Sequence, residues 1–354
     1  MAIPTQDASN IFTKKVIEVY DDWRSPLGFL RGFFQTVETA AKEVSIEVTR
    51  GTEKYAVDIL PGSNGNRNTY SKYTEKIFAP PMYDEKSDVT SLEGYDSIRD
   101  GNAAIGRLIT SVGKDMARNR ALIERAYEKQ CKEALFGGGI ITLKSTDNVD
   151  FKRKAGSQVD KGGAGYWVTS NPTVNPLIDL ETGAKWLRAN GKITGSTLVV
   201  ILGGEALNAM KSMPLFKDTA NLRRVEQILM AKGADTAVGG VPQGIVTSGA
   251  FTFTLFTYPE TYDEAGVATN YVPDNKVLLI PERPNFKMAF GGTPQVFNMP
   301  KGSIFPQAIK SVKGAFATYS QLDMNGMTHV MGVRSRGLAI MTGVDQAYTL
   351  QVLA

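Results

Sequence analysis

One long stretch constrains the fold more than any other part of this sequence. Between about residues 97 and 143, apolar side chains recur at the three-and-four spacing of an amphipathic helix. Residues 137–139 are all glycine and end this pattern, because glycine has low helical propensity and adopts left-handed geometry freely. We predict a helix from about Asn102 to Phe136, roughly 50 Å long at ~1.5 Å per residue. Its apolar positions are Ile105, Leu108, Ile109, Val112, Met116, Ile123, Ala126, Tyr127, Cys131, Ala134 and Leu135.

The length of this helix limits the folds that can contain it, since helices of globular proteins average about three turns. A coiled coil is the alternative, but the apolar pattern drifts and lacks sustained heptads. A β-like run, Ile140 to Leu143, follows the glycines. We therefore predict an α+β fold in which the long helix lies across a sheet. The charged face of the helix carries Arg107, Lys114, Asp115, Arg118, Arg120, Glu124, Arg125, Glu128, Lys129, Lys132 and Glu133.

Composition places the chain among ordinary globular proteins. Its 354 residues can bury a sizeable core, and we expect two lobes. The net charge of +4 is too mild to indicate a strong nucleic-acid binder, which would concentrate positive charge in a patch. No apolar run approaches the ~20 residues of a membrane span, and the N-terminus lacks the pattern of a secretory signal. We expect synthesis inside the cell and no membrane partner.

Residues 1–45 are predicted to form an extended arm that leads into a short helix. Residues 27–34 read Leu-Gly-Phe-Leu-Arg-Gly-Phe-Phe, an aromatic patch with little sequence around it to bury it. The patch must therefore pack either on the main body or on a neighbouring subunit. Phe29, Phe33 and Phe34 are accordingly candidates for contacts between subunits.

Residues 46–95 have the pattern of a long β-hairpin. Apolar residues alternate with polar ones around Ile46–Ile59 and again around Tyr70–Ile77, and residues 61–68 between them form a turn-rich cluster. A lone hairpin is marginally stable in water, so this one must pack on its own body or reach onto another molecule. We predict further intersubunit contacts there, at Arg67, Tyr70, Lys72 and Tyr73.

The rest of the chain alternates helical and β-like segments without an internal repeat. Helices are expected at residues 179–190, around 205–213 and at 217–232, and a buried strand at 197–202. A strand pair is expected within residues 238–258 and a strand at 276–280. The C-terminal region alternates through residues 328–333, 338–341 and 348–353.

Catalytic chemistry finds little support in these residues. His329, the only histidine, lies in an alternating apolar strand and is read as structural, which leaves a serine or cysteine triad without a base. Cys131 is the only cysteine, lies on the apolar helix face and excludes disulfides within one chain. No phosphate-binding loop motif occurs, and Gly203-Gly204 is read as a plain strand–helix turn. We predict no catalytic residue, no cofactor and no metal site.

Charged clusters are read as solvated surface. The acidic groups Asp84, Glu85 and Asp88, and Glu260, Asp263 and Glu264, both lie in turn-rich segments, although an enzyme that uses carboxylates alone stays an alternative. The basic residues read as surface charge are Arg223, Arg224, Arg334, Arg336 and the run Lys152, Arg153 and Lys154. The predicted N-terminal arm, projecting hairpin, long helix and glycine-rich loops are instead suited to contacts between subunits in a closed symmetric assembly.

Three segments, in this order, carry a resemblance to a known family. They are the aromatic run at residues 27–34, Asn-Tyr-Val-Pro-Asp-Asn-Lys-Val-Leu-Leu at 270–279, and the ending Tyr-Thr-Leu-Gln-Val-Leu-Ala at 348–354. The sequence resembles the major capsid proteins of tailed bacteriophages with the Hong Kong 97-type fold, and more narrowly the family of the lambda major capsid protein.

The resemblance implies a division of the chain into named parts. These are an N-terminal arm (1–45), an extended loop (46–95), a peripheral domain with the long helix as its spine (96–193), an axial domain (194–280) and the C-terminal strands of the peripheral domain (281–354).

The resemblance also implies partners and a place. The chain would assemble with itself as pentamers and hexamers into an icosahedral head around double-stranded DNA, and it would require a separate scaffolding protein, a portal and, in some relatives, a decoration protein. Its place would be the virion, after assembly in the cytoplasm of the host bacterium. Some relatives crosslink lysine to asparagine, but nothing here selects such a pair and we predict no crosslink. An encapsulin-like shell around protein cargo is the alternative function.

Overall fold

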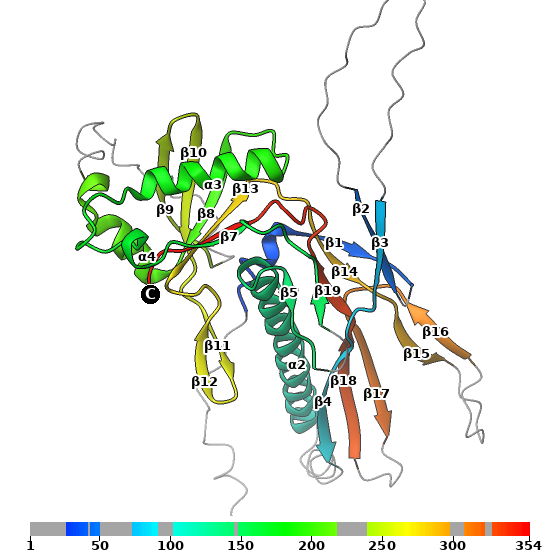
Figure 1. The fold of residues 1–354 in the computed structure, drawn as a ribbon. Coiled ribbons are helices and arrows are strands. Elements are labelled where there is room, and N and C mark those ends of the chain that lie inside the picture. The colour runs from blue at the N-terminus through cyan, green and yellow to red at the C-terminus, as the bar shows by residue number, and fades with distance from the viewer. Residues whose placement is uncertain are drawn as a thin grey trace, which may run out of the picture.

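The structure of the chain is a computed structural model, and its long helix has the predicted bounds. Helix α2 runs from Asn102 to Phe136 (Figure 1). The amide of Gly137 still donates to the Glu133 carbonyl at 2.8 Å, after which Gly138 and Gly139 adopt a φ of +80° that ends the helix. The structure describes residues 26–41, 43–49, 73–90, 102–144, 148–217, 239–297, 308–322 and 328–354.

Helix α2 lies against two three-stranded sheets, as the prediction of a helix across a sheet requires. One sheet has the order β1-β14-β19, with β1 parallel to β14. The other has the order β17-β18-β4, with all its pairs antiparallel. Their strands are β1 (Phe34–Glu38), β14 (Phe286–Phe290), β19 (Gly337–Ile340), β17 (Ala317–Leu322), β18 (Thr328–Ser335) and β4 (Tyr83–Thr90).

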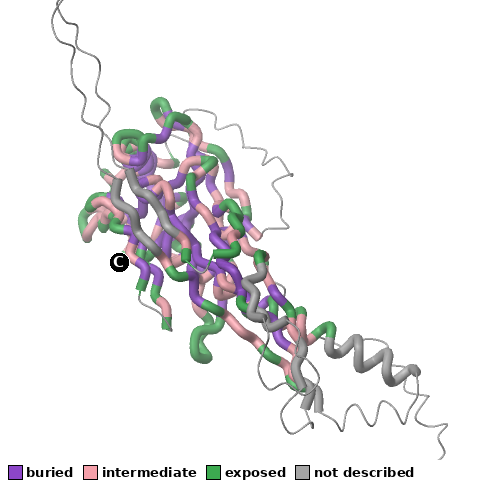
Figure 2. Tube along the Cα trace, turned by 90° about the vertical axis from the view of Figure 1, so that its right-hand side faces the viewer, coloured by how far each residue is buried: buried purple, intermediate pink, exposed green. Residues whose placement is uncertain are grey.

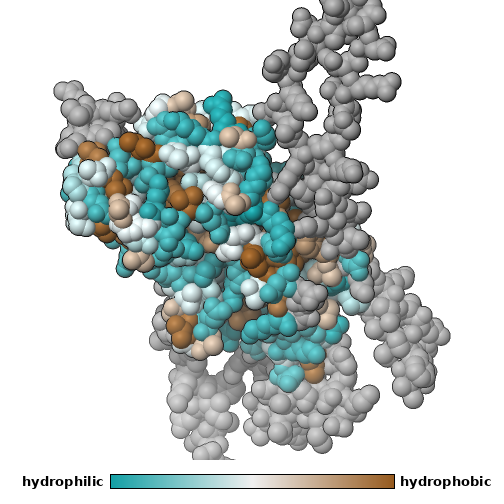
Figure 3. All heavy atoms as spheres, in the orientation of Figure 1, coloured by the Kyte–Doolittle hydropathy of each residue, from teal (hydrophilic) through white to brown (hydrophobic). Residues whose placement is uncertain are grey.

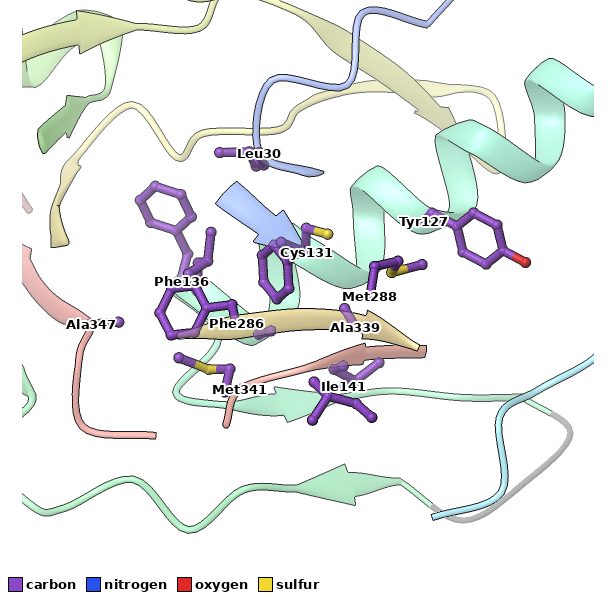
Figure 4. Close-up of a cluster of buried hydrophobic side chains, with 14 of the residues drawn as sticks. Leu30, Tyr127, Cys131, Phe136, Ile141, Phe286, Met288, Ala339, Met341 and Ala347 are labelled. Atoms are coloured by element: carbon purple, nitrogen blue, oxygen red, sulfur yellow. The ribbon is translucent and has the colours of Figure 1, made fainter. Parts of the chain in front are cut away.

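The apolar face of α2 forms the centre of the first hydrophobic core. Tyr127, Cys131 and Leu135 are completely buried. Tyr127 and Cys131 of α2 belong to one buried cluster with Met288 of β14 and Ala339 of β19 (Figure 4), and the Tyr127 ring packs against Phe290 of β14 at 5.5 Å. Burial raises the pKa of the Cys131 thiol well above its usual value, which agrees with the prediction of a buried thiol.

A six-stranded mixed sheet forms the second half of the molecule. Its order is β7-β20-β13-β8-β10-β9, and helices α3 and α4 cover one of its faces. Helix α3 begins where the Asn175 side chain accepts a hydrogen bond from the Leu177 amide at 3.0 Å, with Pro176 as the first helical residue. The elements are β7 (Gln158–Asp160), α3 (Pro176–Asn190), β8 (Thr197–Leu202), α4 (Gly204–Ser212), β9 (Val241–Ser248), β10 (Phe251–Thr257), β13 (Lys276–Pro281) and β20 (Tyr348–Gln351).

Strand β8 shows how this sheet separates two cores. Successive side chains of a strand point to opposite faces. Leu198, Val200 and Leu202 pack with α3 and α4, whereas Val199 and Ile201 belong to the core around α2. Because both faces are covered, β8 is apolar at every buried position. Figure 2 shows the buried residues running through the middle of the molecule, with the exposed ones at its rim.

Short hairpins and turns complete the described chain. Figure 1 shows β2–β3 and β15–β16 projecting from one side of the body and β11–β12 beside α2. Their bounds are β2 (Val44–Thr49), β3 (Tyr73–Phe78), β11 (Thr261–Glu264), β12 (Val267–Asn270), β15 (Thr293–Phe297) and β16 (Ala308–Val312). The remaining elements are β5 (Ile140–Ile141), β6 (Val149–Asp150) and the 3-10 turns η2 (Arg31–Phe33) and η3 (Gly163–Gly165).

Most predicted elements are confirmed. Helix α3 and strand β20, which the resemblance assigned to the peripheral domain together with the long helix, pack on and within the six-stranded sheet. Strand β20 pairs with β13, and Trp186 of α3 stacks on Tyr348 of β20 at 5.4 Å. Strand β4, within the predicted loop at 46–95, pairs with β18 rather than with the hairpin. The helix expected at 217–232 lies outside the described residues beyond Lys217.

Candidate assembly surfaces

The aromatic patch near the N-terminus is fastened to α2 by one buried carboxylate. Glu128 is only 1% exposed, and its two oxygens accept hydrogen bonds from the amides of Leu30 at 2.7 Å and Arg31 at 3.0 Å. These amides belong to the start of turn η2, where backbone donors have no partner within the turn. Glu128 was predicted on the charged, outward face of the helix, which is wrong because the N-terminal segment covers it.

Burial dominates the electrostatics of this carboxylate. It raises the pKa of Glu128 from its usual 4.5 to about 7, while the hydrogen bonds from Leu30, Arg31 and Tyr258 and the charge of Arg31 lower it. The Arg31 guanidinium lies over the rings of Tyr127 and Phe290, at 5.9 and 5.8 Å from their centroids. The same acid in turn raises the pKa of Tyr258, after the larger effect of burial. The segment is thus held by both charge and aromatic contacts.

The predicted contact residues of the patch mostly face their own subunit. Phe29 is 8% exposed; its ring packs edge-on against Phe33 at 5.3 Å and in a tilted arrangement against Tyr258 at 5.3 Å. Phe34 is 4% exposed and packs against Phe286 at 5.2 Å. The sequence left open whether the patch packs on the main body or on a neighbouring subunit. Phe29 and Phe34 pack on the main body of their own subunit, so they offer a neighbour little surface. Phe33 is half-buried and stays a candidate.

The projecting hairpin is described only at its base. Strands β2 and β3 pair antiparallel from Val44 opposite Phe78 to Thr49 opposite Tyr73. Phe78 packs on Phe151 at 5.7 Å, which anchors the base of the hairpin to the body. The predicted contact residue Tyr73 therefore begins β3, and the others, Arg67, Tyr70 and Lys72, lie outside the described residues.

A hollow of about 710 Å³ lies between α2, the N-terminal segment and hairpin β11–β12. Its apolar side chains include Leu27 and Leu122, which are 38% and 47% exposed. The hairpin is tied to α2 by an ion pair between Lys129 and Glu264 at 2.5 Å and by a hydrogen bond from Lys132 to the Tyr262 hydroxyl at 2.9 Å. On the face of the molecule drawn in Figure 3, the most hydrophobic residues lie in small groups among hydrophilic ones.

One carboxylate of each predicted acidic cluster has a role in holding the fold. Asp84 accepts hydrogen bonds from the Tyr319 hydroxyl at 2.6 Å and from Arg334 at 3.0 Å, and Arg334 lies over the Tyr319 ring at 3.9 Å. Asp263 accepts from the Gly266 amide at 2.6 Å and closes the β11–β12 turn. Among the described residues, no group of histidine, cysteine, aspartate or glutamate side chains could hold a metal ion.

Several basic residues read as surface charge have structural roles instead. Arg336 donates to the carbonyls of Gly292 and Pro80 at 3.1 and 3.2 Å. Arg153 donates to the carbonyls of Leu135, Ser157 and Ala347 at 2.9, 3.3 and 2.6 Å. Burial lowers the pKa of Arg153 to about 10. Nothing in the local pattern of residues distinguishes Arg153 from an exposed arginine. Arg223 and Arg224 lie outside the described residues.

Arg153 and Thr349 both donate hydrogen bonds to the carbonyl oxygen of Leu135, where the two halves of the molecule meet. The Leu135 carbonyl lies in the last turn of α2, where no helical amide is available to it. It accepts from Arg153 at 2.9 Å and from the Thr349 hydroxyl of β20 at 3.2 Å. A cation at a helix C-terminus also interacts favourably with the helix dipole. The end of the long helix is therefore bonded directly to the six-stranded sheet.

The order of these parts agrees with comparisons to known proteins. A model of the family described as phage major capsid protein E matches residues 22–309, most of the chain. This chain belongs to that family. The capsid protein is thus a structural component of a phage shell, and its place is the capsid of the virion. The family also favours a phage head over the encapsulin-like alternative.

Solved capsid structures share the fold of this capsid protein. A prophage capsid protein from E. coli CFT073 is 15% identical over 92% of this chain and 93% of its own, with a TM-score of 0.60. The capsid of cyanophage A-1(L) is 11% identical over 99% of each chain, with a TM-score of 0.55. At such identities the similarity shows the fold, and it confirms the Hong Kong 97-like α+β architecture.

Two negative findings complete the description. The search of curated proteins gave no match. In the part of the chain that the structure describes, no helix is long and apolar enough to cross a membrane.

Proposed function

We propose that this capsid protein assembles without catalysis as pentamers and hexamers into an icosahedral head around double-stranded DNA. The observation that carries the proposal is hairpin β2–β3, whose described strands, Val44–Thr49 and Tyr73–Phe78, lie at one side of the body (Figure 1). A two-stranded hairpin is marginally stable in water, and no third described strand pairs with it. Its partner is therefore a neighbouring subunit, and many such contacts around a closed shell sum to tight assembly.

The parts of the chain take the following places in this proposal. Residues 1–45 are the N-terminal arm and residues 46–95 the extended loop. Helix α2 is the spine of the peripheral region, and the six-stranded sheet with α3 and α4 forms the axial region at the centre of each ring. We expect a separate scaffolding protein, a portal and, as in some relatives, a decoration protein as partners. Assembly takes place in the cytoplasm of the host bacterium.

Deletion of residues 63–68 from the hairpin tip tests this proposal. The described base of the hairpin and both cores stay intact in this variant, so its melting temperature as a free subunit should equal that of the wild type. We expect it to form few closed particles in sedimentation velocity runs. Wild-type yields of particles from the deletion variant would refute an intersubunit role for the hairpin.

A single substitution in the aromatic patch provides a second test of the contacts between subunits. It changes one partly exposed residue and not the whole patch. Phe33→Ser changes a half-buried side chain and leaves the buried Phe29 and Phe34 in place. We expect this variant to fold and to assemble less.

The contents of wild-type particles separate the two candidate functions. Nuclease-protected DNA inside wild-type particles supports a phage head, whereas a packaged protein cargo would favour the encapsulin-like alternative.

A further inference from the structure

Two hairpins at one side of the body begin at the same point of the fold. The chain enters hairpin β2–β3 after Ala41 and leaves it before Pro80, and it enters hairpin β15–β16 after Gly292 (Figure 1). The Gly292 amide donates to the Ala41 carbonyl at 2.9 Å. A Cβ atom at Gly291 would lie 3.3 Å from both the Ala41 carbonyl oxygen and the Pro80 ring. The segments that carry the two hairpins are therefore in contact, and we call Ala41, Pro80, Gly291 and Gly292 the hairpin root.

Arg336 bonds to the base of each hairpin with a single side chain. It lies between β18 and β19, and its guanidinium donates to the carbonyls of Gly292 at 3.1 Å and Pro80 at 3.2 Å. Gly292 and Pro80 are buried and lie outside the strands, so Arg336 supplies donors that strand pairing does not. The two bonds come from different nitrogens of one planar group, which fixes the angle between them.

The backbone of Arg336 connects this group to the main body. Its carbonyl accepts from the Gly291 amide at 2.8 Å, and the next residue begins β19, a strand that is buried at every position. The Ala339 amide of β19 donates to Gln130 of α2 at 3.0 Å. The guanidinium therefore holds both hairpins with respect to the same core.

The other contacts of the hairpin bases are less directional. Each hairpin is a sheet of two strands, to which no third described strand is paired. Phe78 packs on Phe151 at 5.7 Å and holds the base of β3 on the body, but apolar burial has no preferred direction. Hydrogen bonds weaken steeply as their angle changes. The bonds from Arg336 are thus suited to set the direction of each hairpin.

We propose that Arg336 is a positioning residue for assembly, which fixes the directions of hairpins β2–β3 and β15–β16 relative to each other in the free subunit. The inference rests on the proposed function, in which hairpin β2–β3 binds a neighbouring subunit. A hairpin that already has the direction required in the shell loses less conformational freedom when it binds. Without the guanidinium each hairpin still forms but changes its direction freely about its base.

Distances between two spin labels in free subunits test this inference. The labels are attached to Glu47→Cys in β2 and Lys310→Cys in β16, and Cys131 is completely buried, so it stays unlabelled. We expect a narrow distance distribution when Arg336 is present and a broad one in Arg336→Met. Arg336→Lys should give an intermediate width, because an ammonium lacks the planar fork of the guanidinium.

Arg334→Met is the matched control. Arg334 lies two residues away and is half-buried like Arg336, but it donates to Asp84 within the sheet β17-β18-β4. The control should keep the narrow distribution and assemble like the wild type. We expect Arg336→Met to need at least about tenfold more protein for half-maximal particle formation, which corresponds to ~1.4 kcal/mol.

Hydrogen exchange separates a loosened root from a failure to fold. In Arg336→Met the Gly292 amide should lose protection, whereas the buried Ala339 amide should keep it. If Ala339 also loses protection, Arg336→Lys is the variant that decides.

An equally narrow distribution without the guanidinium, or a broad one already in the wild type, would overturn the inference. Equal broadening in the control, or assembly of Arg336→Met at wild-type concentrations, would also overturn it. Failure of the wild type to form particles would instead refute the proposed function, and the distances would still decide whether Arg336 fixes the hairpins.

Discussion

Replacement of Glu128 by glutamine should remove a pH dependence from the stability of the subunit. The carboxylate is buried and bonded to the amides of Leu30 and Arg31. In the folded protein the pKa of Glu128 is about 7, against its usual 4.5. The folded state therefore binds a proton more tightly than the unfolded state. Glu128→Gln keeps the shape of the side chain and cannot titrate.

The sign of the effect follows from this raised pKa. Below about pH 4.5 the acid is protonated in both states, and its favourable contribution is fully present. As the pH rises through 7, the folded protein must keep a charge out of water, and that contribution is lost. A shift of this size corresponds to about 3 kcal/mol. The stability of the wild type relative to the variant should therefore fall by about 3 kcal/mol between pH 4.5 and pH 8.

Urea unfolding of free subunits at several pH values measures this difference. All other titrating groups are shared by the two proteins, so their contributions cancel in the comparison. The amides of Leu30 and Arg31 donate to Glu128, so a loss of their exchange protection between pH 4.5 and pH 8 that is larger in the wild type than in the variant would localise the effect. A stability difference that stays constant over this pH range would refute the buried, proton-binding role of Glu128.

The remaining predictions concern packing and the joint between the two halves. Arg153→Met should cost roughly 2–4 kcal/mol of unfolding free energy, because the Ala347 carbonyl loses its hydrogen bond to Arg153 and the carbonyls of Leu135 and Ser157 lose one of their two, keeping those from Thr349. Arg153→Lys should recover only part of this stability, because an ammonium lacks the planar fork of the guanidinium. Full stability of Arg153→Met in urea would contradict this prediction. Gly183→Val should destabilise by about 1–3 kcal/mol or more, since a Cβ there would lie 2.7 Å from the Tyr348 ring and 3.1 Å from Leu279. Gly113→Ala, where nothing lies within 4 Å on an exposed part of α2, should instead raise the melting temperature through ~0.5–1 kcal/mol of helix propensity. Equal melting of the two glycine variants would show that the packing around α3 is looser than the structure indicates.

The sequence predicts the elements of this fold better than their assembly. The spacing from Ile105 to Leu135 determines α2, and the continuous apolar run of β8 indicates a strand covered on both faces. These patterns depend only on residues close in sequence. The place of β20 in the six-stranded sheet depends on its pairing with β13, about seventy residues earlier, and no local pattern encodes that choice.

Charged residues limit prediction for the same reason. Glu128 and Arg153 look like surface charges in the sequence, yet each is buried by a segment distant in the chain. A charge in the sequence is usually exposed, and the exceptions depend on partners that only the folded structure brings together. The aromatic patch at residues 27–34 did indicate that something must cover it. Glu128 supplies the polar part of that attachment.

Electron cryomicroscopy of the purified chain, expressed with and without its scaffolding partner, tests the central claim most directly. The account predicts closed icosahedral shells of pentamers and hexamers, in which hairpin β2–β3 of each subunit lies on a neighbour and the six-stranded sheets surround the centre of each ring. Particles that never exceed a monomer or dimer under any of these conditions, or shells in which the hairpin contacts only its own subunit, would contradict it.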